Sequence, residues 1–110
     1  RSGQVLESES SIIILGDVNP GARVISTGNV VVLGSLKGLV FAGANGNQNS
    51  FVVALEMAPM QIRIGDVIAR SGDAAPLKPS KNVDPKIAFV DDNNIYIEKL
   101  DKNVLSDIRL

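Results

Sequence analysis

Apolar residues recur at every sixth position over the stretch from Ile12 to Gly43. They form one column: Ile12, Val18, Val24, Val30, Leu36 and Ala42. Four positions after these lie small residues: Gly16, Ala22, Gly28 and Gly34. The pair Leu15-Gly16 returns as Leu33-Gly34 after three such periods. Neither an amphipathic helix nor a simple hairpin produces this spacing, so we predict a small β-solenoid with three short strands in each turn.

Short β-branched runs around this stretch predict the individual strands. The predicted strands cover residues 5–6, 12–15, 22–26, 30–33, 39–42, 51–55, 60–64 and 67–69. Corners are expected at 16–21, where Pro20 fixes its φ and Gly21 can take a positive φ, and at 34–38. The polar segment 44–50 interrupts the six-residue frame as a flexible insertion. We therefore predict about three to four coils.

A different pattern follows the solenoid. Residues 71–84 read as a loop, and residues 86–90 and 95–100 as two strands joined by an Asx-rich turn at 91–94. We expect this hairpin either to cap one end of the solenoid or to pair with another chain. The tail 101–110 is predicted to be a short helix that Asp101 could cap, because apolar residues follow a helical spacing at Leu100, Val104, Leu105 and Ile108.

Composition narrows the class of protein. The chain has 110 residues, which suits one domain, with 45% apolar but only 4% aromatic residues. The core must therefore be aliphatic, and the aromatic platforms of nucleic-acid readers are missing. The net charge of -1 gives no field that would attract nucleic acid or an anionic membrane. Cysteine is absent, so disulfides and thiolate metal sites are excluded.

Residues that usually carry catalysis are missing from the sequence. The chain has no histidine, which removes the commonest general base and metal ligand. It contains neither a Gly-Lys-Ser/Thr phosphate loop nor a Gly-x-Gly-x-x-Gly motif. The oxygen ligands at 91–94 and Glu98 lack calcium-loop spacing, so the cluster reads as a solvated turn. We expect no catalytic residue, no metal, no cofactor and no enzymatic activity.

Three kinds of protein fit a solenoid of this size. The period of six is shared with the left-handed hexapeptide β-helix of acyltransferases, although those enzymes typically depend on a histidine that this chain lacks. A purely structural solenoid is a second possibility. A binding module is the third, because the exposed strand edges that end a solenoid must be capped or paired. Pairing with a second copy would give a two-fold dimer, with the final coil and the 86–100 hairpin as candidate surfaces.

Several motifs, taken in order, resemble the C-terminal domain of the septum site-determining protein MinC. The resemblance covers about residues 1–100 and rests on seven segments: 1–4 (Arg-Ser-Gly-Gln), 16–22, 28–30, 34–38, 42–44, 85–90 and 95–97. It implies a right-handed triangular β-helix that forms a homodimer and binds the membrane-associated ATPase MinD. The tail 101–110 departs from the family pattern, and no function is assigned to it.

The resemblance also implies a role in cell division. MinC with MinD inhibits FtsZ polymers, so that the septum does not form at wrong sites. The chain has no initiator Met, no signal peptide and no apolar run of membrane-spanning length, and we expect a fragment without the family's N-terminal domain. Such a fragment is expected to be cytoplasmic, to reach the inner membrane face through ATP-bound MinD, and to engage FtsZ weakly. No nucleic-acid partner or direct membrane insertion is expected.

The Arg-Ser-Gly-Gln motif is a MinD-contacting element in the family. It carries over to Arg1, Ser2, Gly3 and Gln4. The residue chemistry agrees, because an arginine offers several donors in a plane and a glycine allows close approach of two backbones. The corner formed by Asp17, Asn19 and Pro20 supplies secondary candidates for the same surface. A second Arg-Ser-Gly, at 70–72, is followed by Asp73 and reads as a turn that could lie near the first copy.

Overall fold

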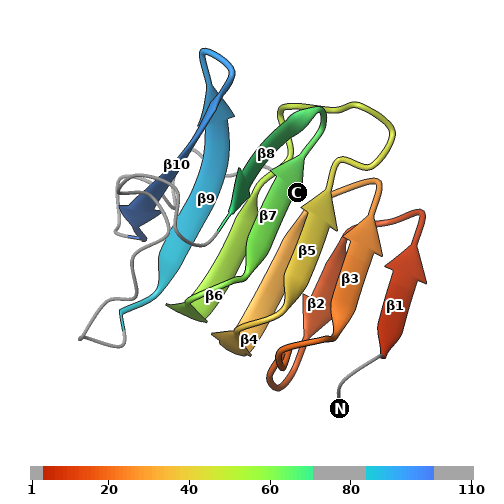
Figure 1. Cartoon of the computed structure of the whole chain (residues 1–110), viewed down its shortest axis with the longest axis vertical. Coiled ribbons are helices and arrows are strands. Elements are labelled where there is room, and N and C mark those ends of the chain that lie inside the picture. Colours follow the sequence, from red (N-terminus) through yellow and green to blue (C-terminus); the bar gives the residue numbers. More distant parts are fainter. Residues whose placement is uncertain (1–3, 71–83, 101–110) are drawn as a thin grey trace.

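The computed structural model describes residues 4–70 and 84–100, and within these residues the chain forms β-strands and no helix (Figure 1). The strands are β1 (Val5–Ser8), β2 (Ile12–Ile14), β3 (Arg23–Ser26), β4 (Val30–Leu36), β5 (Leu39–Ala42), β6 (Val52–Met57), β7 (Gln61–Ile64), β8 (Val67–Arg70), β9 (Lys86–Asp91) and β10 (Asn94–Lys99). The predicted β-solenoid is therefore confirmed. The predicted helix at 101–110 and most of the predicted loop at 71–84 lie outside the described residues.

Two five-stranded sheets form the long sides of the solenoid. Sheet A has the order β1-β3-β5-β7-β8, and sheet B the order β10-β9-β6-β4-β2. A short third side begins at Val18, which bridges to Leu36, and continues where the end of β4 pairs with the end of β6. In Figure 1, β1, β3, β5 and β7 point upward, the strands behind them point downward, and successive coils advance to the left. The coils are thus right-handed, which disagrees with the left-handed acyltransferase alternative.

The column of every sixth residue forms the inner wall of the first two coils. All six members are buried, with exposed fractions between 0% at Val30, Leu36 and Ala42 and 9% at Ile12. Parallel pairing stacks equivalent residues directly, for example Ile12 on Val30 and Val30 on Val52. Burying each valine, leucine or isoleucine of the column contributes roughly 1.5–3 kcal/mol, so the stack is a large stabilising contribution to the fold.

Polar residues turn the corner between sheets A and B. Asn29 is only 8% exposed, and its Oδ1 accepts a hydrogen bond of 3.0 Å from the backbone N–H of Phe51 in the next coil. Its own backbone N–H donates to Ser11 Oγ in the preceding coil, also at 3.0 Å. Ser26 is fully buried and donates its hydroxyl to the Ser10 carbonyl oxygen at 2.6 Å. Buried polar groups are therefore paired between coils, as their desolvation requires.

The structure differs from the sequence prediction in two strands. β4 continues to Leu36, through the predicted corner, because a register shift between Val32 and Ser35 lets the strand bend onto the third side. β8 does not start another coil; it turns back at Gly65 (φ +60°) and pairs antiparallel with β7. The regular coil therefore ends at β7.

The predicted hairpin is confirmed and extends sheet B. β9 pairs antiparallel with β6, and β10 pairs antiparallel with β9. Its turn places Asp92 and Asn93 at φ +52° and +61°, the left-handed region that Asx residues tolerate. Ala88 and Ile95 of the hairpin and Ala69 of β8 belong to the main core, so these elements close the C-terminal end of the solenoid.

Candidate partner-binding site at the N-terminal end

The predicted site lies where the first coil begins. Arg1, Ser2 and Gly3 are outside the described residues, so Gln4 is the one member of the motif that the structure places. Gln4 is exposed, and its carbonyl oxygen accepts a hydrogen bond of 2.8 Å from the backbone N–H of Arg23. This bond extends the pairing of β1 with β3 by one residue. Gln4 therefore lies at the outer edge of sheet A.

The predicted Asp17–Pro20 corner is anchored to the second coil. The Val18 side chain is buried, its N–H donates to the Ser35 carbonyl at 2.8 Å, and its carbonyl accepts from Lys37 N–H at 2.7 Å. The Asp17 Oδ1 accepts from the Ser35 N–H at 2.7 Å, so this carboxylate has a structural partner as well as an exposed position. Asn19 and Pro20 are exposed. The corner is thus a fixed, solvent-facing loop.

The first and second coils approach each other closely at this corner. Gly34 passes so near Asp17 that an added Cβ would lie 2.6 Å from its Oδ1 and would also overlap the Gly16 backbone. The neighbouring Gly38 similarly leaves no room beside the carbonyl oxygens of Asn19 and Ala22. Gly34 and Gly38 of the second coil therefore let the corner of the first coil pack tightly against the second coil. This close packing explains why the column of small residues has a glycine at position 34.

Gln4 and Asp17 face the same hollow at the end of the solenoid. The two residues come from opposite sides of the first coil, and the hollow between them has a floor of aliphatic side chains and a polar rim. The lining residues are Gln4, Val5, Leu6, Ile14, Asp17, Val18, Ala22, Arg23 and Val24. The structure therefore places Gln4 and Asp17, one residue from each of the two predicted segments, at the same hollow. Asn19 and Pro20 belong to the corner but do not line the hollow.

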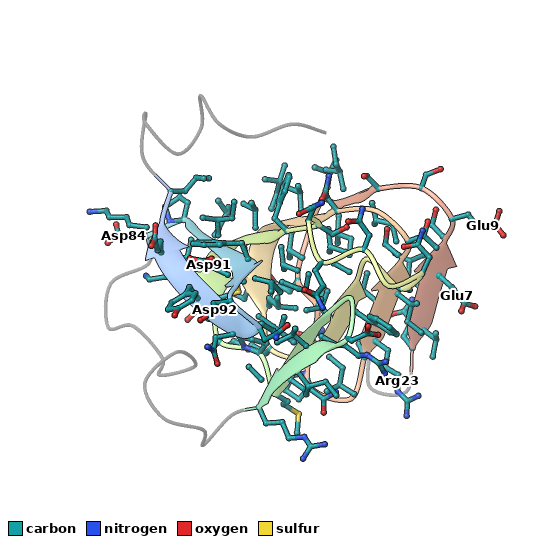
Figure 2. All side chains as sticks on the ribbon, turned by 90° about the horizontal axis from the view of Figure 1, so that it is seen from above. Glu7, Glu9, Arg23, Asp84, Asp91 and Asp92 are labelled. Atoms are coloured by element: carbon teal, nitrogen blue, oxygen red, sulfur yellow. The ribbon has the colours of Figure 1, made fainter. Side chains whose placement is uncertain are left out.

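Figure 2 labels charged side chains at both ends of the molecule. Glu7, Glu9 and Arg23 project from the N-terminal end, whereas Asp91 and Asp92 lie at the hairpin end. Glu7 and Glu9 are exposed, as is Arg23 on the neighbouring strand. The end of the solenoid that carries the hollow therefore presents both signs of charge, an arrangement that gives specificity for a complementary protein surface.

Of the second Arg-Ser-Gly copy and the first motif, the structure describes only Arg70 and Gln4, which lie at opposite edges of sheet A. Arg70 ends β8, which is one edge strand of sheet A, while Gln4 leads into β1, the opposite edge. Arg70 donates from Nε to Gln61 Oε1 at 3.3 Å. Ser71 and Gly72 are outside the described residues. The position of Arg70 separates it from the N-terminal surface by the full width of the sheet.

Sequence reasoning did not select Leu6, Ile14 or Arg23 for this site. Leu6 and Ile14 looked like ordinary strand residues, and their exposure depends on the absence of a coil before the first one in the described part of the chain. No local pattern distinguishes them from the residues stacked on them, because their exposure follows from the order of the described strands.

The described residues form no cluster of three or more acidic side chains that could hold a metal ion. No helix long and apolar enough to cross a membrane was found in the same residues. The described chain is a β-solenoid whose N-terminal end combines fixed polar groups with apolar side chains. Its fold is of the triangular β-helix class.

Comparison with known proteins gives the family. The model of the C-terminal domain of the septum formation inhibitor MinC matches residues 1–100, so the chain belongs to this family. It is 59% identical to a probable septum site-determining protein MinC of Lachnospira eligens over 100% of this chain and 47% of that protein. A protein of the same description from Agathobacter rectalis is 50% identical over 98% of this chain and 47% of its own length. The chain thus spans a little under half the length of these relatives.

A solved structure supports the same assignment. A chain of the MinC:MinD cell division protein complex of Aquifex aeolicus superposes with a TM-score of 0.81 at 33% sequence identity. The match covers 99% of this chain and 92% of that chain. The resemblance noted in the sequence is therefore confirmed, and so is the right-handed triangular β-helix that it implied.

Proposed function

We propose that this chain is a non-enzymatic adaptor domain of a division inhibitor and that it binds MinD. One observation supports the proposal above the others: the fold matches, over nearly its whole length, a chain from a complex named for MinC and MinD. The relatives are named as septum site-determining proteins and not as enzymes. In this role the domain recruits the inhibitor to MinD, and the septum is blocked at wrong sites.

The proposed MinD-binding residues are the N-terminal motif, with the first corner as its neighbour. The motif comprises Arg1, Ser2, Gly3 and Gln4, and the corner contributes Asp17, Asn19 and Pro20. The shared hollow supports this grouping, because Gln4 and Asp17 line it from two sides. The anchoring of Asp17 and Val18 to the second coil also supports it, since a preformed surface loses little conformational entropy on binding.

We further propose that the domain forms a homodimer through the outer face of sheet B. Sheet B is apolar on both sides, whereas most antiparallel or mixed sheets at a surface show one polar face. Leu33 of β4, Leu55 of β6 and Leu15, which directly follows β2, are 42%, 37% and 83% exposed, and Ile13 of β2 is 61% exposed. A two-fold interface would cover these apolar side chains.

Recruitment to the membrane and inhibition of FtsZ follow from this assignment as proposals. The domain acts in the cytoplasm, and ATP-bound MinD carries it to the inner membrane face. Contact with FtsZ by this domain is weak or depends on MinD. The family description as a septum formation inhibitor supports the proposed inhibitory role.

Co-sedimentation with lipid vesicles tests the MinD proposal. The chain is mixed with MinD, ATP and vesicles, and the pelleted fraction is compared between wild type, Arg1→Ala and Gly3→Asp. We expect wild type to pellet only with MinD and ATP, and both variants to lose at least about tenfold in affinity, as substitutions at the centre of an interface do. Arg70→Ala, in the second Arg-Ser-Gly copy, is the matched control.

The outcomes distinguish the proposed MinD binding from the proposed position of the MinD-binding site. If wild type does not pellet with MinD, the function is wrong. If wild type pellets and both variants pellet equally well, MinD binds elsewhere on the domain. If Arg70→Ala weakens pelleting as strongly as Arg1→Ala, loss of an arginine weakens MinD binding wherever it lies on the domain. The Arg1→Ala result would then not locate the MinD-binding site.

A further inference from the structure

The two ends of the solenoid differ in whether other strands cover their last coil. At the C-terminal end, β8 and the β9–β10 hairpin cover the last coil, and Ala69, Ala88 and Ile95 lie within the main core. At the N-terminal end, β1 and β2 are edge strands with one neighbour each among the described strands. Figure 1 shows β1 alone at its end of the solenoid. The first coil therefore has no cap within the part of the chain that the structure describes.

The stacked columns show what the missing cap leaves uncovered. Leu6, Val24, Val40 and Ile62 occupy equivalent inward positions in successive coils. Their exposed fractions are 46%, 3%, 2% and 0% in that order. The same holds in sheet B, where Ile14 is partly exposed and Val32 and Ala54, stacked above it, are completely buried. Leu6 and Ile14 are thus core residues by position and surface residues by exposure.

We propose that an apolar side chain of the MinD-type partner enters this hollow and completes the core of the first coil. The inference rests on the proposed function and specifies what the N-terminal site recognises. Leu6 and Ile14 form the receiving surface, and Gln4, Asp17 and Arg23 form its polar rim. Gln4 on the rim then contacts the partner beside the hollow, while the inserted side chain supplies the buried apolar contact that often dominates affinity.

Charge argues that the occupant is a different protein and not a second copy. Two copies that paired through their short β1 edges would bring two Glu7 side chains, with Glu9 just beyond β1, into one small interface. Like charges on paired strands are destabilising, and β1 has no basic residue to offset them. A different protein can instead place basic groups beside Glu7 and an acidic group beside Arg23.

Paired substitutions test this inference with MinD and ATP in the vesicle assay. Leu6→Gln replaces the receiving surface by a polar side chain of similar size, and Leu6→Met keeps it apolar. Ile68→Gln is the matched control, because Ile68 is 44% exposed on β8, at the opposite edge of sheet A. We expect about tenfold weaker binding for Leu6→Gln, near wild-type binding for Leu6→Met, and no change for the control. Circular dichroism and thermal melting confirm that all variants are folded.

The outcomes keep this inference apart from the proposed function. If wild type and Leu6→Gln bind MinD equally, the hollow is not used and the inference is overturned, while MinD binding itself stands. If Leu6→Gln halves the mass measured by light scattering, the occupant is a second copy, which also overturns it. If wild type does not bind MinD at all, the proposed function fails and the inference fails with it.

Discussion

Asn29 shows how a single residue holds neighbouring coils together. It is buried and links three of them: its N–H donates to Ser11 Oγ, its carbonyl accepts from Ile12 N–H, and its Oδ1 accepts from Phe51 N–H. Phe51 is itself only 7% exposed, so water cannot readily replace the lost acceptor. An alanine at position 29 would leave a buried backbone donor without a partner.

We therefore predict that Asn29→Ala lowers the free energy of unfolding by about 1–3 kcal/mol, the cost of an unsatisfied buried donor. Urea unfolding followed by circular dichroism measures the change. Asn45→Ala is the control, because Asn45 is exposed in the loop between β5 and β6. A loss below about 0.5 kcal/mol at Asn29, the range of ordinary surface substitutions, would contradict this role.

At the scale of single elements, the hairpin turn depends on two residues with positive φ. Asp92 and Asn93 are at +52° and +61°, a conformation that costs most side chains roughly 1–2 kcal/mol and that glycine adopts freely. Asn93→Val is therefore expected to destabilise the domain by about this amount, and Asn93→Gly to be neutral or stabilising. Thermal unfolding of the two variants beside wild type makes the comparison. Equal melting temperatures for Val and Gly would show that the turn relaxes to another conformation.

The elements also show which features a sequence can reveal. The six-residue column predicted the inner wall, because stacking coils bury the same position in each repeat, and all six members are buried. The reversal at Gly65 could not be predicted in this way. Val67, Ile68 and Ala69 are apolar and suit a strand whether it continues the coil or folds back. The outcome depends on the positive φ of Gly65 and its tight packing against Gln48. The open first coil is likewise a property of strand order and not of local pattern.

At the scale of the whole molecule, the outer faces of the two sheets differ in character. Sheet A carries Arg23, Gln61 and Arg63 on its outer side, with the Arg63 guanidinium 4.4 Å from the centre of the Phe41 ring. Sheet B instead has a second apolar cluster outside the main core, formed by Phe51, Val53 and Ile87 with Val31 and Phe89 packed against it. Phe51, Val53 and Ile87 are only 7%, 6% and 5% exposed, so the solvent-facing apolar residues at this side include Ile13, Leu15, Leu33 and Leu55. A group of exposed apolar side chains of this kind often marks an interface with another protein.

The exposed leucines of sheet B are the place to test the proposed homodimer. Leu15 and Leu33 are 83% and 42% exposed, so a charged residue at either position can be solvated in the monomer and should leave it folded. In a dimer covered at this face, the same charge would be buried without a partner, which is strongly unfavourable. We therefore predict that wild type is dimeric at micromolar concentration and that Leu15→Glu and Leu33→Glu are monomeric, as measured by light scattering after gel filtration.

Ile68→Glu provides the contrast that locates the interface. Ile68 is 44% exposed, close to the value for Leu33, but lies on the outer side of sheet A. A dimer built on sheet B keeps its mass in this variant, whereas a dimer built on sheet A dissociates. If wild type is a monomer, the proposed homodimer is wrong, and MinD would bind a single N-terminal site on each domain. If wild type is a dimer and Leu15→Glu and Leu33→Glu are monomers, each dimer carries two N-terminal sites. On a membrane that carries many MinD molecules, binding at one site then raises the effective concentration of MinD at the other site.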